Sequence, residues 1–189
     1  MMRFFISLAS LASLVLFSGL SQAQTWIMDP AQSSLSLNAQ VYGAPFEATF
    51  ESFETDIRFD PEDLAAANVV ATISLADIAP AIADDAVYIS ELQGADWFFS
   101  DQFPVARFES QNFSDLGGGS YRVDGTLSIK DQASPVSFDF DLDFSGDQVV
   151  MNAEFPVNRF DLGLGLLTHP NEGTVNAEVM INLKIIANQ

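Results

Sequence analysis

The stretch VNAEVMINLKI, residues 175–185, carries the clearest pattern in the chain, because every second side chain in it is apolar. The alternating apolar positions are Val175, Ala177, Val179, Ile181, Leu183 and Ile185. Successive side chains of a strand point to opposite faces, so this period of two is typical of a strand with one buried face. The stretch predicts such a strand, with its other face toward solvent.

The same period of two recurs outward from this strand along most of the chain. It runs through residues 34–41, 46–50, 53–59, 69–75, 121–129, 138–144 and 149–157. Turn residues separate several runs, with three glycines at 117–119, Ser-Gly-Asp at 145–147 and a further reversal at 131–135. We therefore predict about eight antiparallel strands.

Two irregularities interrupt the pattern. The alternation slips by one residue between Phe50 and Phe53, which predicts a β-bulge that bends the strand. Residues 77–101 do not alternate and are rich in alanine. The acid pair at 84–85 suits a helix N-terminus, and Tyr88 and Leu92 stand at helical spacing, so this segment predicts one helical insertion.

About eight antiparallel strands can close into a barrel, which removes the unpaired edges of an open sheet. A barrel of that size can hold one small ligand in its interior. A two-sheet sandwich would show the same alternation, and the 17 phenylalanines of the chain could fill the core of either fold. With neither an internal repeat nor a linker in the sequence, we predict a single mostly β domain over residues 24–189.

Composition excludes several classes of function. The chain has no cysteine and one histidine, which excludes disulfides, thiolate metal sites and multi-histidine metal centres. Its 26 acidic and 7 basic side chains give a net charge of −19, so the phosphates of nucleic acid would be repelled. Crowded acids also predict a thermal stability that rises as salt screens their repulsion.

The first 23 residues have the composition of a secretory signal peptide. Arg3 precedes an apolar run from Phe4 to Leu20, and small residues stand before a cleavage site after Ala23. An uncleaved membrane anchor is the alternative, although the run is short for a span. We expect residues 1–23 to be removed and the rest to be a secreted, periplasmic protein.

Four motifs in order make the chain resemble the YceI-like family of polyisoprenoid-binding proteins from the bacterial periplasm. They are WIMDP at 26–30, DWF at 96–98 leading into FPVARFES at 103–110, YRVDGTLSI at 121–129, and NRFDLG at 158–163. Two departures concern one barrel mouth. Asp131-Gln132-Ala133 stands where the family usually has a Gly-x-Thr turn, and the loop after Gly163 is short.

The resemblance implies a lipocalin-like barrel that encloses a polyisoprenoid or an isoprenoid-quinone-like lipid, without catalysis and without a further cofactor or metal. It also allows a homodimer and a transient contact with a membrane that donates or accepts the lipid. Side chains expected to line the barrel or its mouth are Leu35, Leu37, Phe50, Phe53, Ile73, Leu75, Trp97, Phe98, Phe108, Phe138, Phe140, Arg159, Val179 and Ile181. The alternative is a ligand-independent envelope stress or interaction protein with a solid core, and a lipid-modifying enzyme ranks third.

Several polar residues have two interpretations. Arg159, beside Asp161, either contacts a ligand head group or fixes the loop that begins at Gly163 through an ion pair or carbonyl contacts, and we favour the second. Residues 97–99 either form a lid or pack under the helix. We expect no metal at His169, and none at Asp139, Asp141 and Asp143, which are predicted to lie on the solvated face of a strand.

Overall fold

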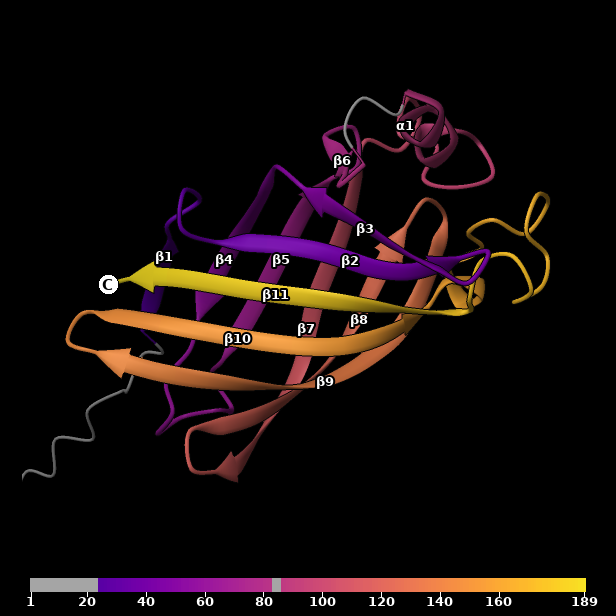
Figure 1. The fold of residues 1–189 in the computed structure, drawn as a ribbon. Coiled ribbons are helices and arrows are strands. Elements are labelled where there is room, and N and C mark those ends of the chain that lie inside the picture. The colour runs from indigo at the N-terminus through magenta and orange to yellow at the C-terminus, as the bar shows by residue number, and fades with distance from the viewer. Residues whose placement is uncertain (1–23, 83–85) are drawn as a thin grey trace, which may run out of the picture.

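The computed structural model describes residues 24–82 and 86–189, which form eleven strands, one α-helix and one short 3-10 helix. The strands are β1 (Thr25–Met28), β2 (Ser34–Val41), β3 (Ala44–Phe50), β4 (Phe53–Arg58), β5 (Asn68–Ser74), β6 (Ile78–Pro80), β7 (Val105–Gly117), β8 (Ser120–Ile129), β9 (Gln132–Ser145), β10 (Gln148–Asn158) and β11 (Glu178–Asn188). The helices are α1 (Ala86–Gln93) and η1 (Arg159–Leu162). Figure 1 shows them along the chain.

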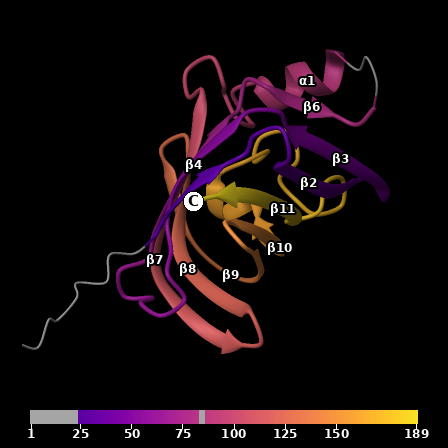
Figure 2. The ribbon, with the colours of Figure 1, turned by 90° about the vertical axis from the view of Figure 1, so that its left-hand side faces the viewer.

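The strands form one closed antiparallel barrel. Their order is β1-β4-β5-β7-β8-β9-β10-β11-β2-β3-β6, and β1 also pairs with β11, which closes the ring. Three positions in the ring are each shared by two short strands, namely β1 with β2, β3 with β4, and β5 with β6, so the barrel has eight positions. Figure 2 shows the strands arranged around the barrel axis. The structure confirms the predicted barrel rather than the sandwich.

The phase slip between Phe50 and Phe53 marks a break shared by two neighbouring strands, in place of the predicted bulge in one. β3 ends at Phe50 and β4 begins at Phe53, while β5 and β6 are interrupted opposite them. The amide of Ser74 donates to the carbonyl of Ser52 across the break at 2.9 Å. Because of the break, both phenylalanines face the interior although they are three residues apart.

The predicted helical insertion over residues 77–101 is much shorter in the structure. Among the described residues of this segment, only Ala86–Gln93 is helical, and Ile78–Pro80 is a strand that pairs with β3. The helix ends before Gly94, whose amide donates to the carbonyl of Glu91, and the chain then turns back as the amide of Phe98 donates to the carbonyl of Leu92. The acid pair at 84–85 lies outside the described residues.

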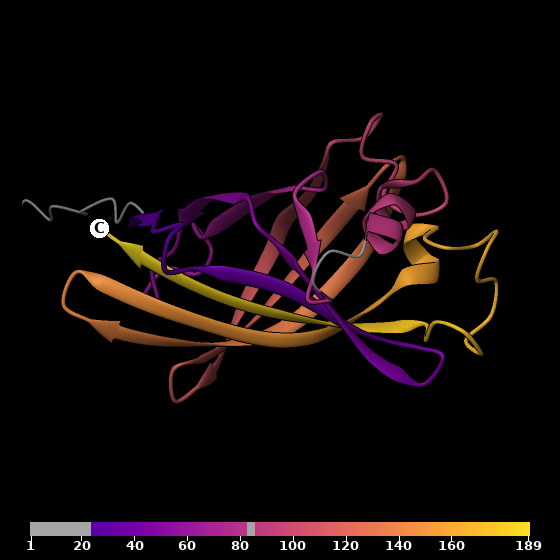
Figure 3. The ribbon, with the colours of Figure 1, turned by 45° about the horizontal axis from the view of Figure 1, so that its top comes forward.

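The two ends of the barrel differ in what closes them. We call the end with α1, the β2–β3 turn and residues 159–177 the helix end. The end with the β7–β8 and β9–β10 turns and residues 59–67 is the hairpin end. Figure 3 shows α1 and the β9–β10 turn at opposite ends of the long axis. Each end has its own apolar cluster, one including Leu75 and Trp97 and the other including Trp26 and Phe59.

Candidate binding cavity

A cavity of about 250 Å³ lies inside the barrel. Its walls run from Trp26 and Phe144 at the hairpin end to Tyr88, Trp97 and His169 at the helix end, so it extends along the barrel axis. Inward-facing side chains of nearly every strand line it, and they are overwhelmingly apolar. This long, narrow space is the candidate site.

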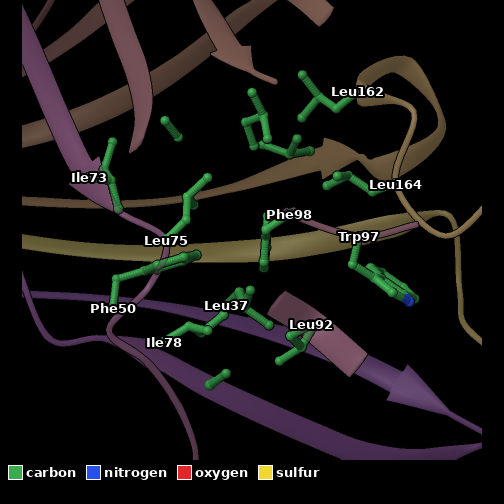
Figure 4. Packing of buried hydrophobic residues seen from close by; sticks show 14 of the residues in the cluster. Leu37, Phe50, Ile73, Leu75, Ile78, Leu92, Trp97, Phe98, Leu162 and Leu164 are labelled. Carbon is green, nitrogen blue, oxygen red and sulfur yellow. The ribbon is translucent and has the colours of Figure 1, made fainter. Parts of the chain in front are cut away.

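Every side chain that the sequence predicted to line the barrel is on the wall of this cavity. The set comprises Leu35, Leu37, Phe50, Phe53, Ile73, Leu75, Trp97, Phe98, Phe108, Phe138, Phe140, Arg159, Val179 and Ile181. Figure 4 shows how Leu37, Phe50, Leu75 and Phe98 converge at the helix end. For ten residues of the set the placement follows from the period of two, whereas Trp97, Phe98, Phe108 and Arg159 were expected there from the family motifs. Whether any of them binds a ligand stays a prediction.

Aromatic rings fill most of the hairpin end. The ring of Phe59 makes edge contacts with Phe113 and Tyr121 at centroid distances of 5.5 and 5.3 Å, and Phe140 stacks against Tyr121 at 5.7 Å. Edge-to-face and offset pairs of this kind are favourable beyond the apolar area that they bury. At this end Trp26 is 3% exposed, and its Nε1 donates to the carbonyl of Phe59 at 3.0 Å. The hairpin end is therefore filled largely by packed aromatic rings, and the indole of Trp26 is satisfied.

Between the two clusters, the rings of Phe138 and Phe155 stack with centroids 3.9 Å apart. Nearby, the ring of Phe108 lies over Gly125, where a Cβ atom would come within 2.5 Å of Phe108 Cε2. Gly125 is therefore required by the close approach of this ring. The β7–β8 pairing also shifts register between Ser110 and Asn112, next to this contact.

Several polar side chains line the cavity, and the sequence analysis missed most of them as wall residues. Glu91 and His169 meet at the helix end, with His169 Nδ1 3.7 Å from Glu91 Oε1. The hydroxyl of Thr55 and Nε1 of Trp97 are buried and have no hydrogen-bond partner within the described part of the chain. Thr55 continues the alternation of Phe53 and Ile57, so the period of two could have identified it.

Arg159 is the one buried charged side chain among the described residues, at 1% exposure. Its Nε donates to the carbonyl of Asn176 at 3.0 Å, and its two terminal nitrogens donate to five further carbonyls. These carbonyls belong to Leu164, Gly165, His169, Asn171 and Val175, at distances from 2.8 to 3.4 Å. One guanidinium thus fixes residues 164–176, while Asp161 is exposed. Of the two interpretations of Arg159, the structure shows the carbonyl contacts.

Burial is the main cause that lowers the pKa of Arg159, and the charges of Asp96 and Glu172 oppose it. A guanidinium nevertheless stays protonated in proteins, so the helix end contains a fixed positive charge surrounded by carbonyl dipoles. The guanidinium also lies over the ring of Phe160, 4.0 Å from its centroid. Its N–H groups are directed to backbone carbonyls, so Arg159 positions the loop.

Gly165 allows the loop to pass close to Trp97. Its φ of +70° is left-handed, and a Cβ atom there would lie 2.7 Å from Cζ2 of Trp97 and 3.1 Å from Nη1 of Arg159. Both the conformation and the space therefore require glycine. Trp97 and Phe98 belong to the cluster at the helix end, whereas Phe99 has a φ of +50° and contacts Phe103 instead. The three aromatic residues do not act as one lid.

Asp96 holds the other side of the same loop. Its carboxylate accepts the amide of Leu167 at 3.0 Å and both the amide and the hydroxyl of Thr168, at 2.8 and 2.6 Å. Burial alone would raise the pKa of Asp96, but these hydrogen bonds together outweigh burial and lower the pKa. The Thr168 hydroxyl also contacts Nδ1 of His169, which links the carboxylate to the cavity wall.

Comparison with known proteins identifies the family. The YceI-like domain family matches residues 26–187. The chain belongs to this family. The crystal structure of BcnA from Burkholderia cenocepacia is 27% identical, with a TM-score of 0.79 over 85% of this chain and 99% of that one. A Vibrio cholerae protein of the UPF0312 group is 24% identical over 77% of this chain and 70% of its own length.

Two further solved structures share the YceI-like fold. A polyisoprenoid binding domain from Saccharophagus degradans, implicated in plant cell wall breakdown, is 15% identical with a TM-score of 0.67, covering 86% of this chain and 97% of that one. The Campylobacter jejuni YceI protein is 17% identical with a TM-score of 0.64, covering 75% and 84%. At these identities the likeness concerns the fold.

The outer face of the YceI-like barrel is strongly acidic. Asp139, Asp141 and Asp143 are exposed on β9, where Asp139 pairs with Arg122 and Asp141 accepts the hydroxyl of Ser120. Residues 24–82 and 86–189 contain no group of three histidine, aspartate or glutamate side chains placed to hold a metal. Within the same residues, no helix is long and apolar enough to cross a membrane.

Proposed function

We propose that this YceI-like protein is a non-enzymatic carrier that holds a polyisoprenoid or an isoprenoid-quinone-like lipid inside its barrel, after export to the periplasm and removal of residues 1–23. The single observation that carries the proposal is the apolar cavity along the barrel axis. The relative from Saccharophagus degradans, described as a polyisoprenoid binding domain, supports the same class of ligand.

The dimensions of the cavity favour a slender chain. Its volume of about 250 Å³ is just under the usual range for ligand sites, about 300–1,000 Å³, yet its walls extend over both apolar clusters. Each methylene buried in such a space contributes about 0.8 kcal/mol. A long hydrocarbon therefore gains affinity by its length alone, without a bulky pocket.

We infer that the lipid's head group lies at the helix end, where most of the polar wall residues are. There, Nε1 of Trp97 is a buried donor without a partner, and Glu91 and His169 lie on the wall. A buried donor left unpaired costs about 1–3 kcal/mol, so a head-group oxygen that accepts this hydrogen bond would be favoured. Arg159 acts as a positioning residue, because its N–H groups are directed to backbone carbonyls.

The direct test is lipid mass spectrometry on protein purified from its native periplasm. We expect an isoprenoid lipid in wild type and loss of that lipid in Ala71→Leu, which narrows the cavity at mid-barrel. Thr72→Leu, one residue along the same strand, is the matched control and should retain the lipid. Protein that is consistently free of lipid would instead support a ligand-independent stress or interaction protein.

Trp97→Phe tests the position of the head group. It removes the Nε1 donor and keeps most of the ring, so we expect weaker binding of a polyprenol or a quinone and unchanged binding of the hydrocarbon squalene. Trp26→Phe, at the other end, should not weaken the binding of the polar lipids more than the binding of squalene. The reason is that Nε1 of Trp26 already donates to the carbonyl of Phe59. Equal losses for squalene and the polar lipids would place the head group elsewhere.

A further inference from the structure

Four large apolar side chains are exposed around the helix end of the barrel. They are Tyr42 at 75% exposure, Val87 at 72%, Leu166 at 45% and Leu167 at 84%. The β2–β3 turn, α1 and the loop after Gly163 supply them, and Figures 1 and 3 both show these three segments together at one end. We call these four residues the portal rim.

The segments that carry the rim are held in place. Leu167 donates its amide to Asp96, and Arg159 binds carbonyls on both sides of the two leucines, at Leu164 and His169. The loop is therefore anchored before and after Leu166-Leu167, while the leucine side chains remain in water. A loop fixed in this way keeps both leucines at the surface in the folded protein.

Tyr42, also in the portal rim, has an unusual backbone conformation. Its φ is +52°, a left-handed conformation that costs a bulky residue about 1–2 kcal/mol, and its ring is mostly exposed. The amide of Tyr42 donates to the carbonyl of Thr174 at 2.6 Å, which ties this turn to the leucine loop. A strained residue that gains little packing indicates a functional constraint.

Two of the three rim segments carry no acidic side chain, whereas α1 carries Glu91. Residues 30–46 contain no charged side chain, and residues 162–171 contain only His169, in a chain with 26 acids. The turns of the hairpin end, by contrast, carry Asp115, Asp143 and Asp147. An apolar surface with few acids on a protein of net charge −19 suits a partner without net charge, whereas an anionic partner is repelled by the protein as a whole.

The segments that carry the rim also supply wall residues of the cavity. Glu91, on α1 with Val87, and His169, on the loop with the two leucines, both line the cavity, and the side chain of Glu91 is 38% exposed. An apolar molecule that enters or leaves at this point crosses the rim. Exposed leucine and tyrosine side chains are the types that insert into the boundary between lipid head groups and acyl chains.

We propose that the portal rim docks on the surface of a bilayer of zwitterionic phospholipid, and that lipid passes between bilayer and cavity through it. That the transferred molecule is a lipid held in the barrel rests on the proposed function. The docking itself can be measured with protein that holds no lipid. A second copy of the chain is the competing occupant of such a surface, and the test separates the two.

The test is flotation with vesicles of pure phosphatidylcholine, using the full exported protein. We compare wild type with Leu166→Ser/Leu167→Ser and with Tyr42→Ser. Burying one leucine side chain in the bilayer raises the partition coefficient of the protein onto vesicles about tenfold. We therefore expect the vesicle-bound fraction of the double variant to fall by at least about tenfold. The matched control is Ile27→Ser/Leu116→Ser, which removes two exposed apolar side chains, at 69% and 50% exposure, away from the rim and should float like wild type.

A second measurement follows solanesol, loaded from detergent, as it moves from the protein to the same vesicles. The rim variants should take up as much solanesol as wild type and release it at least about tenfold more slowly. Failure of all variants to take up solanesol, with flotation intact, would overturn the proposed function but not the docking. Wild-type protein that does not float, or a control that loses flotation equally, would overturn the docking. Rim variants that change only the oligomeric state would assign the surface to a second copy.

Discussion

The two ends of the barrel are built by the same alternating strands, yet different interactions close them. At the hairpin end, Trp26 donates to Phe59 and a group of aromatic rings fills the interior. At the helix end, Arg159 and Asp96 hold a loop across the opening, and the indole of Trp97 has no partner among the described residues.

The difference shows which end suits the passage of a ligand. The hairpin end is closed by packing between strand residues, and opening it would expose several large aromatic rings. The helix end is closed by a loop that hydrogen bonds hold and whose Leu164 and Val175 pack into the apolar cluster. A loop outside regular structure can open locally without breaking a strand pairing, so we expect a ligand to pass at the helix end.

Among substitutions that test the difference between the two ends, Arg159→Met should change the free energy of unfolding most. The substitution leaves several buried carbonyls without a donor, and each costs about 1–3 kcal/mol, so we expect the free energy of unfolding to fall by at least about 3 kcal/mol. Arg122→Met removes an exposed ion pair with Asp139 and should have little effect. Urea titrations measure both. A small loss for Arg159→Met would mean that the loop does not depend on its guanidinium.

Gly165→Ala and Gly146→Ala compare the same change at the two ends. Both glycines have left-handed φ, +70° and +62°, but a Cβ at Gly165 would meet Trp97 whereas nothing lies within 4 Å of Gly146. We expect a loss of about 1–2 kcal/mol at Gly146 from the backbone alone, and a further 1–3 kcal/mol or so at Gly165 from the clash. Thermal unfolding of the pair measures the difference, and equal losses would show that the ring of Trp97 moves aside freely.

A smaller effect should follow acidification at Asp96. Because hydrogen bonds lower its pKa in the folded state, its stabilisation is complete above the ordinary value of 3.8 and is lost as pH falls through the lower folded pKa. We expect the amide NMR signals of Leu167 and Thr168 to titrate in that acidic range and to stay constant in Asp96→Asn. Asp124, whose pKa is lowered chiefly by the hydroxyl of Ser137, is the control, since Asp124→Asn should not alter those signals. Signals that titrate equally in Asp96→Asn would assign the effect to another acid.

The smallest predicted effect concerns salt. The thermal midpoint should rise with NaCl at pH 7, because salt screens the repulsion among acids, with a screening length of about 8 Å at 0.15 M. We expect the slope of the thermal midpoint against NaCl concentration to decrease more in Asp143→Asn/Asp147→Asn, at the hairpin end, than in Asp101→Asn/Asp131→Asn, at the helix end. The reason is that Lys130 lies beside Asp131 and already offsets part of the repulsion there. Thermal unfolding at a series of NaCl concentrations measures the slope for wild type and both variants. A wild-type midpoint that stays flat would mean that the acids are paired or well separated.

The sequence by itself determined the strands, their buried faces and several of their turns. A strand has a local period, so the inward positions of Phe138 and Phe140 follow from alternation alone. For the same reason the apolar wall residues on the alternating strands were predictable, such as Leu35 and Ile181, whereas Glu91 and His169 were not. The phase slip after Phe50 located the strand break correctly, although it could not show that the neighbouring strand breaks as well.

Only the tertiary structure decided how the helix end is built. Asp96 meets Thr168 across 72 residues of sequence, Arg159 finds six carbonyls in a loop without regular structure, and His169 reaches Glu91 on α1. No local period encodes such contacts, because they depend on where the closed barrel places separate loops. The length of α1 was misjudged for a related reason, since Ile78–Pro80 pairs with β3 and that pairing overrides the local preference for helix.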